Sequence, residues 1–319
     1  MADVAHVVPL VVAAALAVLV GLRVAGCERG RPVVAAVALT PYGFPVALIA
    51  TVLAAGAHRW SVTASLLALG AVLGVLVLPR VARTAVPPPP GHALRVLSAN
   101  LLSGRADAQA VVDMVRRHAP DVLCLQELST ELAQELKAAG LGAELPYMDF
   151  DKVGDGRRGV GIASRHPIRH RSRDDPFTAG AVLRPPGRPE VEVISVHPTF
   201  PMGRRGTGPW LAALAALPRA VTTGPVRVLA GDFNATVDHA SFRRLLRSGY
   251  RDAGMETGSG LRHTWPGAVS RWAPRVTLDH VLIDRRGHVR SCTALDLPGS
   301  DHRAVLAELV LPEPLTFEE

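Results

Sequence analysis

Five short motifs in the C-terminal part of the chain carry the side chains that could do chemistry. Each adjoins a short apolar run, and in chain order they are Ser98-Ala99-Asn100, Gln126-Glu127, Gly231-Asp232-Phe233-Asn234, Leu278-Asp279-His280 and Ser300-Asp301-His302. Apolar runs of this length predict buried strands, so the motifs fall at strand ends. They supply carboxylates, amides and imidazoles and no activated serine or cysteine nucleophile. This set favours a divalent metal, a phosphate and an activated water.

The first two motifs offer a strand-end carboxylate and an amide. Glu127 directly follows the apolar run VLCLQ, so its carboxylate should emerge where the strand ends. A carboxylate in that place has to be solvated, paired or metal-bound, because burying it alone is costly. Asn100 ends the run LRVLSAN and would place its amide near the metal or a phosphate oxygen. The alternatives are a charge at a helix start for Glu127 and a strand-to-turn transition for Asn100.

The later motifs offer groups that could handle water and protons. Asp232 and Asn234 are two residues apart, so on an extended segment both side chains point to the same face. Asp232 would orient the attacking water and Asn234 would contact the phosphate, with an Asx turn as the alternative. His302 is the expected general base or phosphate-contacting imidazole, because an imidazole titrates near neutral pH. Asp279 would fix its tautomer and orientation. For His280 a packing role stays open.

Taken in order, the set AN, QE, H, GDFN, LDH and SDH between about Ala93 and Val310 resembles the endonuclease/exonuclease/phosphatase superfamily. The resemblance implies an α/β fold of the DNase I-like kind, a four-layer αββα sandwich in which helices flank two packed β-sheets. It also implies a phosphoesterase that depends on a divalent metal, with Mg²⁺ as the expected ion and Mn²⁺ as the alternative.

The same resemblance assigns roles to individual residues. Glu127 matches the principal metal ligand of the family, and Asn100 and Asp301 would complete the metal site. The implied catalytic residues are His197, Asp232, Asn234, Asp279 and His302. His197 closes the strand VEVISVH and matches a histidine that stabilises the phosphate or protonates the leaving group. A surface histidine at a strand end is the alternative there.

Predicted strands alternate with a few helices around these motifs. We expect strands near residues 94–100, 122–126, 159–163, 191–196, 226–230, 278–283 and 304–309. We expect helices near residues 106–117, 130–139, 210–220 and 240–247. Asp238 is the expected cap of the last helix, and Gly249 is its expected end.

The N-terminal part is apolar and almost uncharged. Residues 4–22, 33–57 and 60–78 hold no charged side chain apart from the titratable His6, and each stretch is long enough to cross a bilayer as a helix. We therefore predict three membrane spans within residues 1–85, with Pro41 and Pro45 kinking the second. A stiff proline-rich linker, 86–91, would join them to one catalytic domain, 92–319.

Charge argues against a polynucleotide partner. The chain has 35 basic and 28 acidic residues, and six arginines and two acidic residues fall within the first 90. The C-terminal part therefore holds 29 basic against 26 acidic residues, too weak an excess for a strongly basic nucleic-acid surface. The three cysteines are too far apart in the sequence for a zinc pattern or a disulfide framework, so we expect them to pack.

The segment 198–210 combines Phe200, Met202 and Trp210 with Arg204 and Arg205. Apolar side chains beside basic ones suit an amphiphilic phosphate at a membrane surface, although an ordinary rim loop is an equal alternative.

Three spans, a proline linker and this catalytic part together resemble the VanJ-type membrane proteins of actinobacteria, a group associated with teicoplanin resistance. That resemblance implies hydrolysis of a lipid-linked phosphate or pyrophosphate of cell-wall synthesis. The alternatives are a membrane-tethered nuclease, a sphingomyelinase-like phosphodiesterase, and a non-catalytic protein that binds lipid or antibiotic.

Two indicators of membrane topology conflict. Arg23, Arg29 and Arg31 in the first loop, and Arg80 after the third span, would place the catalytic part in the cytoplasm by the positive-inside rule. The resemblance implies an extracytoplasmic active site of a multi-pass protein of the cell membrane, and we favour that side because the bias amounts to a few arginines.

Overall fold

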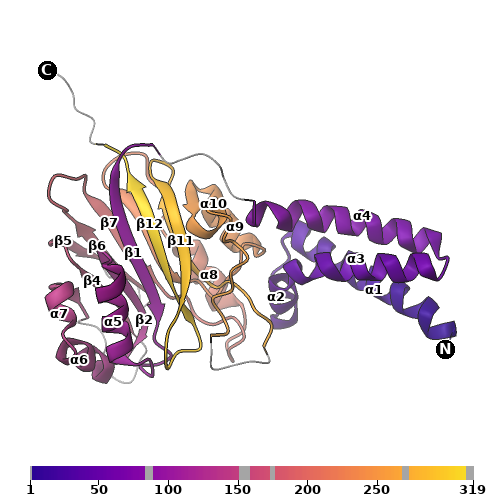
Figure 1. The fold of residues 1–319 in the computed structure, drawn as a ribbon, viewed down its shortest axis with the longest axis horizontal. Helices are drawn as coiled ribbons and strands as arrows, with labels where there is room; N and C mark the ends of the chain where they lie inside the picture. Colours follow the sequence, from indigo (N-terminus) through magenta and orange to yellow (C-terminus); the bar gives the residue numbers. More distant parts are fainter. Residues whose placement is uncertain (1, 83–88, 151–158, 173–176, 268–272, 314–319) are drawn as a thin grey trace, which may run out of the picture.

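The computed structural model describes residues 2–82, 89–150, 159–172, 177–267 and 273–313. From residue 89 onward the chain folds around two six-stranded β-sheets that pack face to face (Figure 1). The first sheet has the order β11 (His288–Asp296), β12 (Arg303–Leu311), β1 (His92–Asn100), β2 (Val122–Leu128), β4 (Gly159–Ser164), β3 (Tyr147–Asp149). The second has the order β5 (Ile168–Ser172), β6 (Thr178–Leu183), β7 (Val191–Val196), β8 (Val226–Asp232), β10 (Asp279–Asp284), β9 (Tyr250–Asp252).

The core between the sheets is aliphatic and follows the two-residue repeat of the strands. Along β8, Val228 and Ala230 point into this core, whereas Leu229 points to the opposite face. Helices cover both outer faces. On the first sheet they are α5 (Ala108–His118), α6 (Thr130–Ala138) and α7 (Leu141–Glu144), and on the second α8 (Gly208–Ala216) and α9 (Ala240–Arg247), with α10 (Ala253–Glu256) beside β10. The predicted αββα sandwich is confirmed.

Each sheet contains one parallel pair, β1 with β2 and β7 with β8, among otherwise antiparallel ladders. Asn100 pairs with Gln126 in the first, and Val196 pairs with Gly231 in the second. Because parallel strands end at the same edge, the residues that follow them lie side by side. Gly231 permits the close approach of β8 to β7, because a Cβ at this position would lie 1.9 Å from the carbonyl oxygen of Val196.

All seven predicted strands and all four predicted helices of this part are present; β7 and α9 have the predicted bounds, and the others have shifted ends. The helix predicted over 210–220 is α8, which ends at Ala216 because Leu217 precedes Pro218 and takes an extended conformation. The predicted cap of α9 is wrong: the N-cap residue is His239, and no side-chain cap bond forms there. Strands β3, β5, β6, β9 and β11 were not predicted.

Helices α1 (Ala2–Ala25), α3 (Thr40–Gly56) and α4 (Trp60–Val77) form a bundle that projects away from the sandwich, and α2 (Arg31–Ala38) lies between the two (Figure 1). The face that α3 buries is made of small residues, Thr40, Gly43, Ala47, Ala50 and Ala54. Small residues at three- and four-residue spacing allow helices to approach closely, as they do inside membranes.

Two of the three predicted spans are single helices long and apolar enough to cross a membrane, Val7–Ala25 and Trp60–Arg80. The second predicted span is a bent pair, α2 and α3, with an angle of 66° between them. The bend falls at Leu39, and Pro41 occupies the first turn of α3, where proline starts a helix well. The first half of the predicted linker 86–91, residues 86–88, lies outside the described residues.

The bundle is fastened to the sandwich by charged groups that are themselves buried. Asp238 accepts hydrogen bonds from Arg80 at 2.5 and 2.7 Å and from Arg23 at 3.1 Å, and the Asp238 side chain is inaccessible to solvent. This pairing is why Asp238 does not cap α9. Glu28 takes over that function from the bundle side, accepting from the amide and the hydroxyl of Ser241 at 3.0 to 3.1 Å.

Candidate active site

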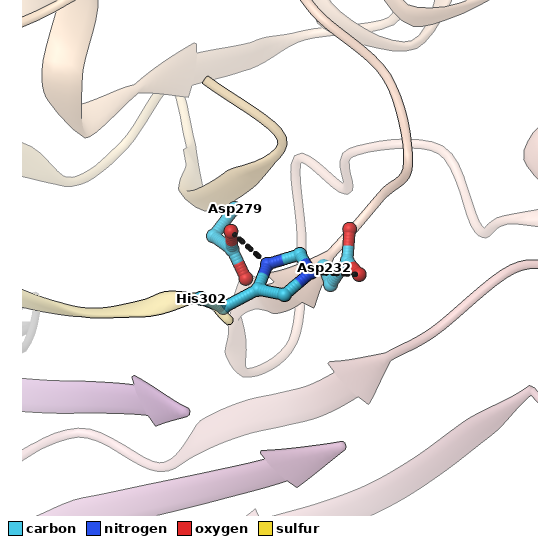
Figure 2. Close-up of side chains that lie close together, drawn as sticks. All are labelled: Asp232, Asp279 and His302. Carbon is cyan, nitrogen blue, oxygen red and sulfur yellow. Dashed lines mark hydrogen bonds and ion pairs between the residues drawn. The ribbon is translucent and has the colours of Figure 1, made fainter. Parts of the chain in front are cut away.

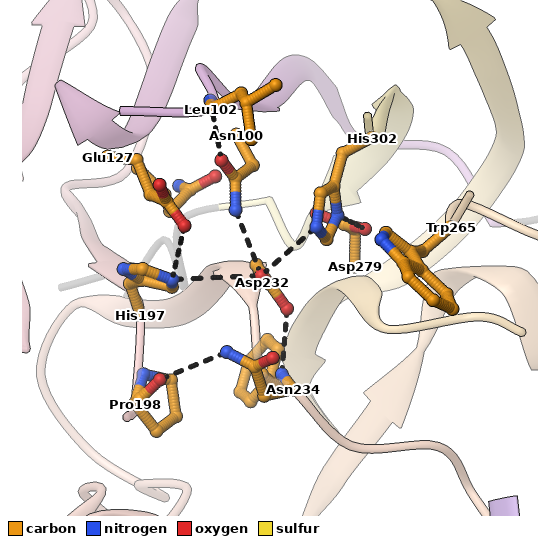
Figure 3. Close-up of polar contacts among 12 residues, drawn as sticks. Asn100, Leu102, Glu127, His197, Pro198, Asp232, Asn234, Trp265, Asp279 and His302 are labelled. Carbon is orange, nitrogen blue, oxygen red and sulfur yellow. Dashed lines mark hydrogen bonds and ion pairs between the residues drawn. The ribbon is translucent and has the colours of Figure 1, made fainter. Parts of the chain in front are cut away.

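The five motifs meet at one rim of the sandwich, where strands of both sheets end (Figure 3). Asn100 ends β1, and Asp232 ends β8 in the other sheet. The Asn100 Nδ2 donates to Asp232 Oδ2 at 3.0 Å, and Asn100 Oδ1 accepts from the Leu102 amide at 3.0 Å. Both side chains are buried. The sandwich therefore joins a motif from each sheet by a direct hydrogen bond.

Glu127 is aimed at this rim by a bulge. Between Leu125 and Leu128, β2 contains one residue more than its partner β4, and Glu127 takes a φ of 54°, in the left-handed region. That conformation is costly for a residue with a side chain, and strained residues of this kind are enriched at functional sites. A bulge re-aims the side chain it carries. Here Glu127 Oε2 accepts from Ser103 Oγ at 2.9 Å, and Glu127 Oε1 lies 3.7 Å from His197 Nε2.

Asp232 lies at the centre of the polar network (Figure 3). Its Oδ2 lies 3.7 Å from the Nε2 of His197 and 3.7 Å from the Nε2 of His302, and its Oδ1 accepts from the Asn234 amide at 2.8 Å. Burial raises the pKa of Asp232, while the two imidazoles and the amide pull it down. Asn234 also has a positive φ, 50°, and its Nδ2 donates to the Pro198 carbonyl at 3.1 Å.

Asp279 and His302 form the pair that the sequence suggested, as Figure 2 shows. The ladder between β8 and β10 sets Asp279 directly opposite Asp232, and His302 Nδ1 lies 2.8 Å from Asp279 Oδ2. Burial lowers the pKa of His302, but the charges of Asp279 and Asp232 outweigh this effect and raise it to about 10. The imidazole is therefore positively charged at neutral pH, and its Nε2–H faces the rim.

His280 has no place in this network. Its Nδ1 lies 2.7 Å from Asp252 Oδ2 and its Nε2 lies 2.9 Å from the Ala235 carbonyl, beneath the aromatic rings of Phe233 and Phe242. Burial lowers the pKa of His280, yet the carboxylate of Asp252 raises it overall. His280 therefore packs and pairs in the core, which is the role left open for it.

Four supporting residues were missed by sequence reasoning. Gln126 joins the two sheets, because its side chain accepts from Ser98 at 3.3 Å and donates to Ser195 at 3.0 Å. Ser300 donates to the Asn100 carbonyl at 2.7 Å and accepts from the His302 amide at 3.0 Å, so it fixes the strand ends that carry two site residues. Thr264 Oγ1 accepts from the Asp279 amide at 3.0 Å. Gln126 and Ser300 belong to the motifs but were given no role, and no motif contains Ser195 or Thr264.

The donor set fits a divalent cation. The carboxylates of Asp232 and Asp279 have ligand atoms within 4.8 Å of each other and of the His302 imidazole. Because a protonated imidazole cannot bind a metal, the carboxylates are the donors that would hold the ion while His302 is charged. Asp301 accepts from the Trp265 indole at 3.3 Å through Oδ2, whereas its buried Oδ1 has no hydrogen-bond partner among the residues the structure describes. With Glu127 included, the rim holds more carboxylates than imidazoles. Its donors are therefore mainly hard oxygen atoms, which favour Mg²⁺ or a similar ion.

The structure thus brings seven of the eight predicted residues into one network of contacts, with Asp301 on the same pocket wall as His302. The cluster closest to metal-ligand spacing is Asp232, Asp279 and His302, whereas the predicted metal ligands were Asn100, Glu127 and Asp301. The amide of Asn100 is engaged by Asp232 and Leu102, so its ligand role stays a prediction, as do the roles of the other two.

A pocket of about 920 Å³ opens over the rim. Its polar lining includes Glu127, His197, Asp232, Asn234, Asp301 and His302. Its apolar lining includes the loop after β7 and the helix α2, and other elements add Leu102, Val160, Phe177, Trp265, Val276 and Leu278. The volume is at the upper end of what small-molecule sites offer, about 300 to 1,000 Å³.

Known proteins share this architecture. Bacteroides thetaiotaomicron mannosyl-6-phosphatase superposes with a TM-score of 0.54 at 19% identity, over 68% of this chain and 100% of that one. D. rerio TDP2 complexed with a single-strand DNA product superposes with a TM-score of 0.54 at 15% identity, over 68% of this chain and 98% of that one. An endonuclease/exonuclease/phosphatase family protein from B. thetaiotaomicron superposes with a TM-score of 0.53 at 18% identity, over 70% of this chain and 99% of that one. At such identities these likenesses show the fold.

A family model, and not a single related sequence, shows the family. No curated protein sequence matches the chain significantly. The family model of the endonuclease/exonuclease/phosphatase family matches residues 97–302, which is more than half of the chain. That stretch begins within β1 and contains Asn100, Glu127, Asp232 and Asp279, and it ends at His302. The chain belongs to the endonuclease/exonuclease/phosphatase family.

Proposed function

We propose that this protein is a membrane-anchored, metal-dependent phosphoesterase that hydrolyses a lipid-linked phosphate or pyrophosphate. The observation that carries the proposal is that one pocket contains the Asp232 and His302 site and is also lined by α2, the helix that continues into the apolar bundle. Family membership supports phosphoester hydrolysis, and the apolar helices support a membrane location.

In this proposal each side chain acts according to its geometry. Asp232 orients the attacking water, because its carboxylate lies between two imidazoles and is held by Asn100. His302 donates from Nε2 to a phosphoryl oxygen or to the departing oxygen, since its raised pKa keeps a proton on it. Asp279 holds Nδ1 and fixes the ring.

The remaining residues complete the phosphate site. His197 approaches from the opposite side of Asp232 and stabilises charge on the phosphate, while Asn234 contributes its side-chain amide. Glu127 and Asp301, with Asn100, would hold Mg²⁺ or Mn²⁺, which supplies neutralisation of charge on the phosphoryl oxygens when bound.

A second candidate function is a tethered nuclease or phosphodiesterase, which the fold likeness to a protein complexed with a DNA product favours. Purified protein should be incubated with Mg²⁺ and either polyprenyl pyrophosphate or plasmid DNA, with and without EDTA. We expect EDTA-sensitive release of phosphate from the lipid and intact plasmid. DNA cleavage without lipid hydrolysis would assign the second function, and binding of lipid without turnover would leave a non-catalytic protein.

The cellular role follows from the same proposal. Hydrolysis of a lipid-linked pyrophosphate of cell-wall synthesis on the outer face of the membrane is the activity we propose. The link to teicoplanin resistance stays a prediction, which a susceptibility assay on cells with and without the gene would test.

A further inference from the structure

Helix α2 is a wall of the active-site pocket as well as a part of the membrane anchor. Val34, Ala35 and Ala38 line the same pocket as His197, Asp232 and His302. These three α2 positions are spaced by one, three and four residues, so they share one face of the helix.

Specific contacts hold α2 in that position. Val34 is 2% exposed and packs into the core under the second sheet, with Trp210 and Phe233. His239 Nδ1 accepts from the Thr236 amide at 2.9 Å, so its Nε2 carries the proton and donates to the Val34 carbonyl at 3.0 Å. Burial lowers the pKa of His239, which keeps the ring in this neutral form. Helix α2 is therefore a fixed wall.

The loop after β7 adjoins α2, since Met202 packs against the cluster that contains Val34, and this part of the lining is apolar too and carries a cation. Phe200 has 58% of its surface exposed, and Met202 lies nearby on the same loop after β7. Arg205, also exposed, lines the pocket beside them. An apolar surface that several residues of one pocket share, and not a single exposed side chain, is the feature that marks a binding site. Two apolar linings with an arginine match a hydrocarbon chain that ends in phosphate.

The connection to the bilayer identifies where such a chain comes from. Only Leu39 separates α2 from α3, which packs in the bundle against α1 and α4. In the proposed membrane location, lipid chains would surround the outer faces of the bundle, where Leu48, Ile49 and Val52 of α3 are exposed. The apolar path from those faces to the pocket therefore runs along α2.

We infer that α2 and the loop residues Phe200 and Met202 form a subsite for the hydrocarbon chain of a bilayer lipid phosphate, whose phosphate lies at Asp232 and His302. The inference rests on the proposed function and adds that the anchor is part of the substrate site. The small side chain of Ala35, exposed beside the pocket, leaves room for the chain.

The test compares two substrates that differ in chain length, polyprenyl pyrophosphate in detergent micelles and the single-isoprene dimethylallyl pyrophosphate. We expect Ala35→Phe to lower the ratio of kcat/KM for the long substrate over the short one by about tenfold or more, because the added ring fills the space of several methylenes. Ala38→Phe is the second variant, and both are used only if thermal melting shows that they fold.

The matched control is Ala14→Phe, the same change at an exposed alanine of α1 remote from the pocket. It should leave the ratio unchanged. An unchanged ratio in both pocket variants would overturn the subsite while the phosphoesterase stands. A wild-type protein that prefers neither chain length would also overturn it. A wild-type protein that releases phosphate from neither substrate would overturn the proposed function, and the subsite with it.

Discussion

Asp232 shows how much of this site depends on one carboxylate and its supports. Its Oδ2 meets Asn100, His197 and His302, and its Oδ1 meets the Asn234 amide. The motifs predicted which residue types would gather, because strand-end polar residues are conspicuous beside apolar runs. They did not predict the supports, because Ser195 and Thr264 look like any other hydroxyl residue in the sequence. The positive φ of Glu127 also leaves no sequence signal, since it arises from a bulge against β4.

At Glu127, replacement by alanine should abolish metal-dependent hydrolysis while the fold is retained. The carboxylate adds charge to the rim and little to the apolar core, and its backbone strain is present in either variant. The measurement is kcat with Mg²⁺, with the melting temperature as the check on folding. A matched control is Glu131→Ala, a charge on the first turn of α6 away from the pocket, which should retain activity. Unchanged turnover in Glu127→Ala would remove this residue from the site.

Asp279 and His302 should behave as one unit. Their 2.8 Å contact implies that losing either disables the same proton-handling group. Single alanine variants should each lower kcat by about a hundred- to ten-thousand-fold, and the double variant should lose little more. His197, which is joined to the network at 3.7 Å, should act more independently. A double-mutant cycle on kcat measures this, and fully multiplicative losses for Asp279 and His302 would contradict the pairing.

At the scale of elements, the interior strands were predicted except β6, and none of the four edge strands was. Buried strands such as β2 and β8 read as continuous apolar runs, whereas β5 and β11 are edge strands with charged or half-exposed side chains. Helix α9 shows a different limit. Its sequence suggested a local cap, but the partner of Ser241 is Glu28, over two hundred residues away in the chain. A contact between residues so far apart in the chain leaves no recognisable pattern in the sequence around either residue.

Asp238→Asn should destabilise the joint between bundle and sandwich. The change removes the charge that compensates Arg80 and Arg23, and breaking a buried ion pair by removing one partner costs about 3 to 5 kcal/mol. Thermal melting in detergent measures the loss. The control is Asp296→Asn, whose side chain is 77% exposed and pairs with Arg303 at the surface, where about 1 kcal/mol or less is expected. Equal melting shifts in the two variants would contradict the role given to Asp238.

At the scale of the whole molecule, hydropathy predicted an apolar N-terminal part but did not predict that one of its helices lines the pocket. Composition cannot tell a helix that faces lipid from one that faces protein, so the segment 33–57 resembled one kinked span. In the structure its first turns leave the bundle and cover the pocket. The arginines of the charge bias also have another explanation, because Arg23 and Arg80 bind Asp238. Their positions therefore weigh less as evidence of a cytoplasmic catalytic part.

An alkaline-phosphatase fusion after Pro90 should be active, which places the sandwich outside the cytoplasm. The N-terminus lies at the end of the bundle far from the sandwich (Figure 1), so a green fluorescent protein fused there should fluoresce in the cytoplasm. A silent phosphatase together with a dark N-terminal fusion would reverse the orientation.

Consider a chimera that takes the N-terminal helices from one parent protein and the sandwich from another. Its contacts between bundle and sandwich would be mismatched unless residues 23, 28, 34 and 80 come from the same parent as residues 238–241. The two parts of this protein are therefore not interchangeable modules. In diverging lineages, a change on one side of the joint should be tolerated only when the other side has already changed to match.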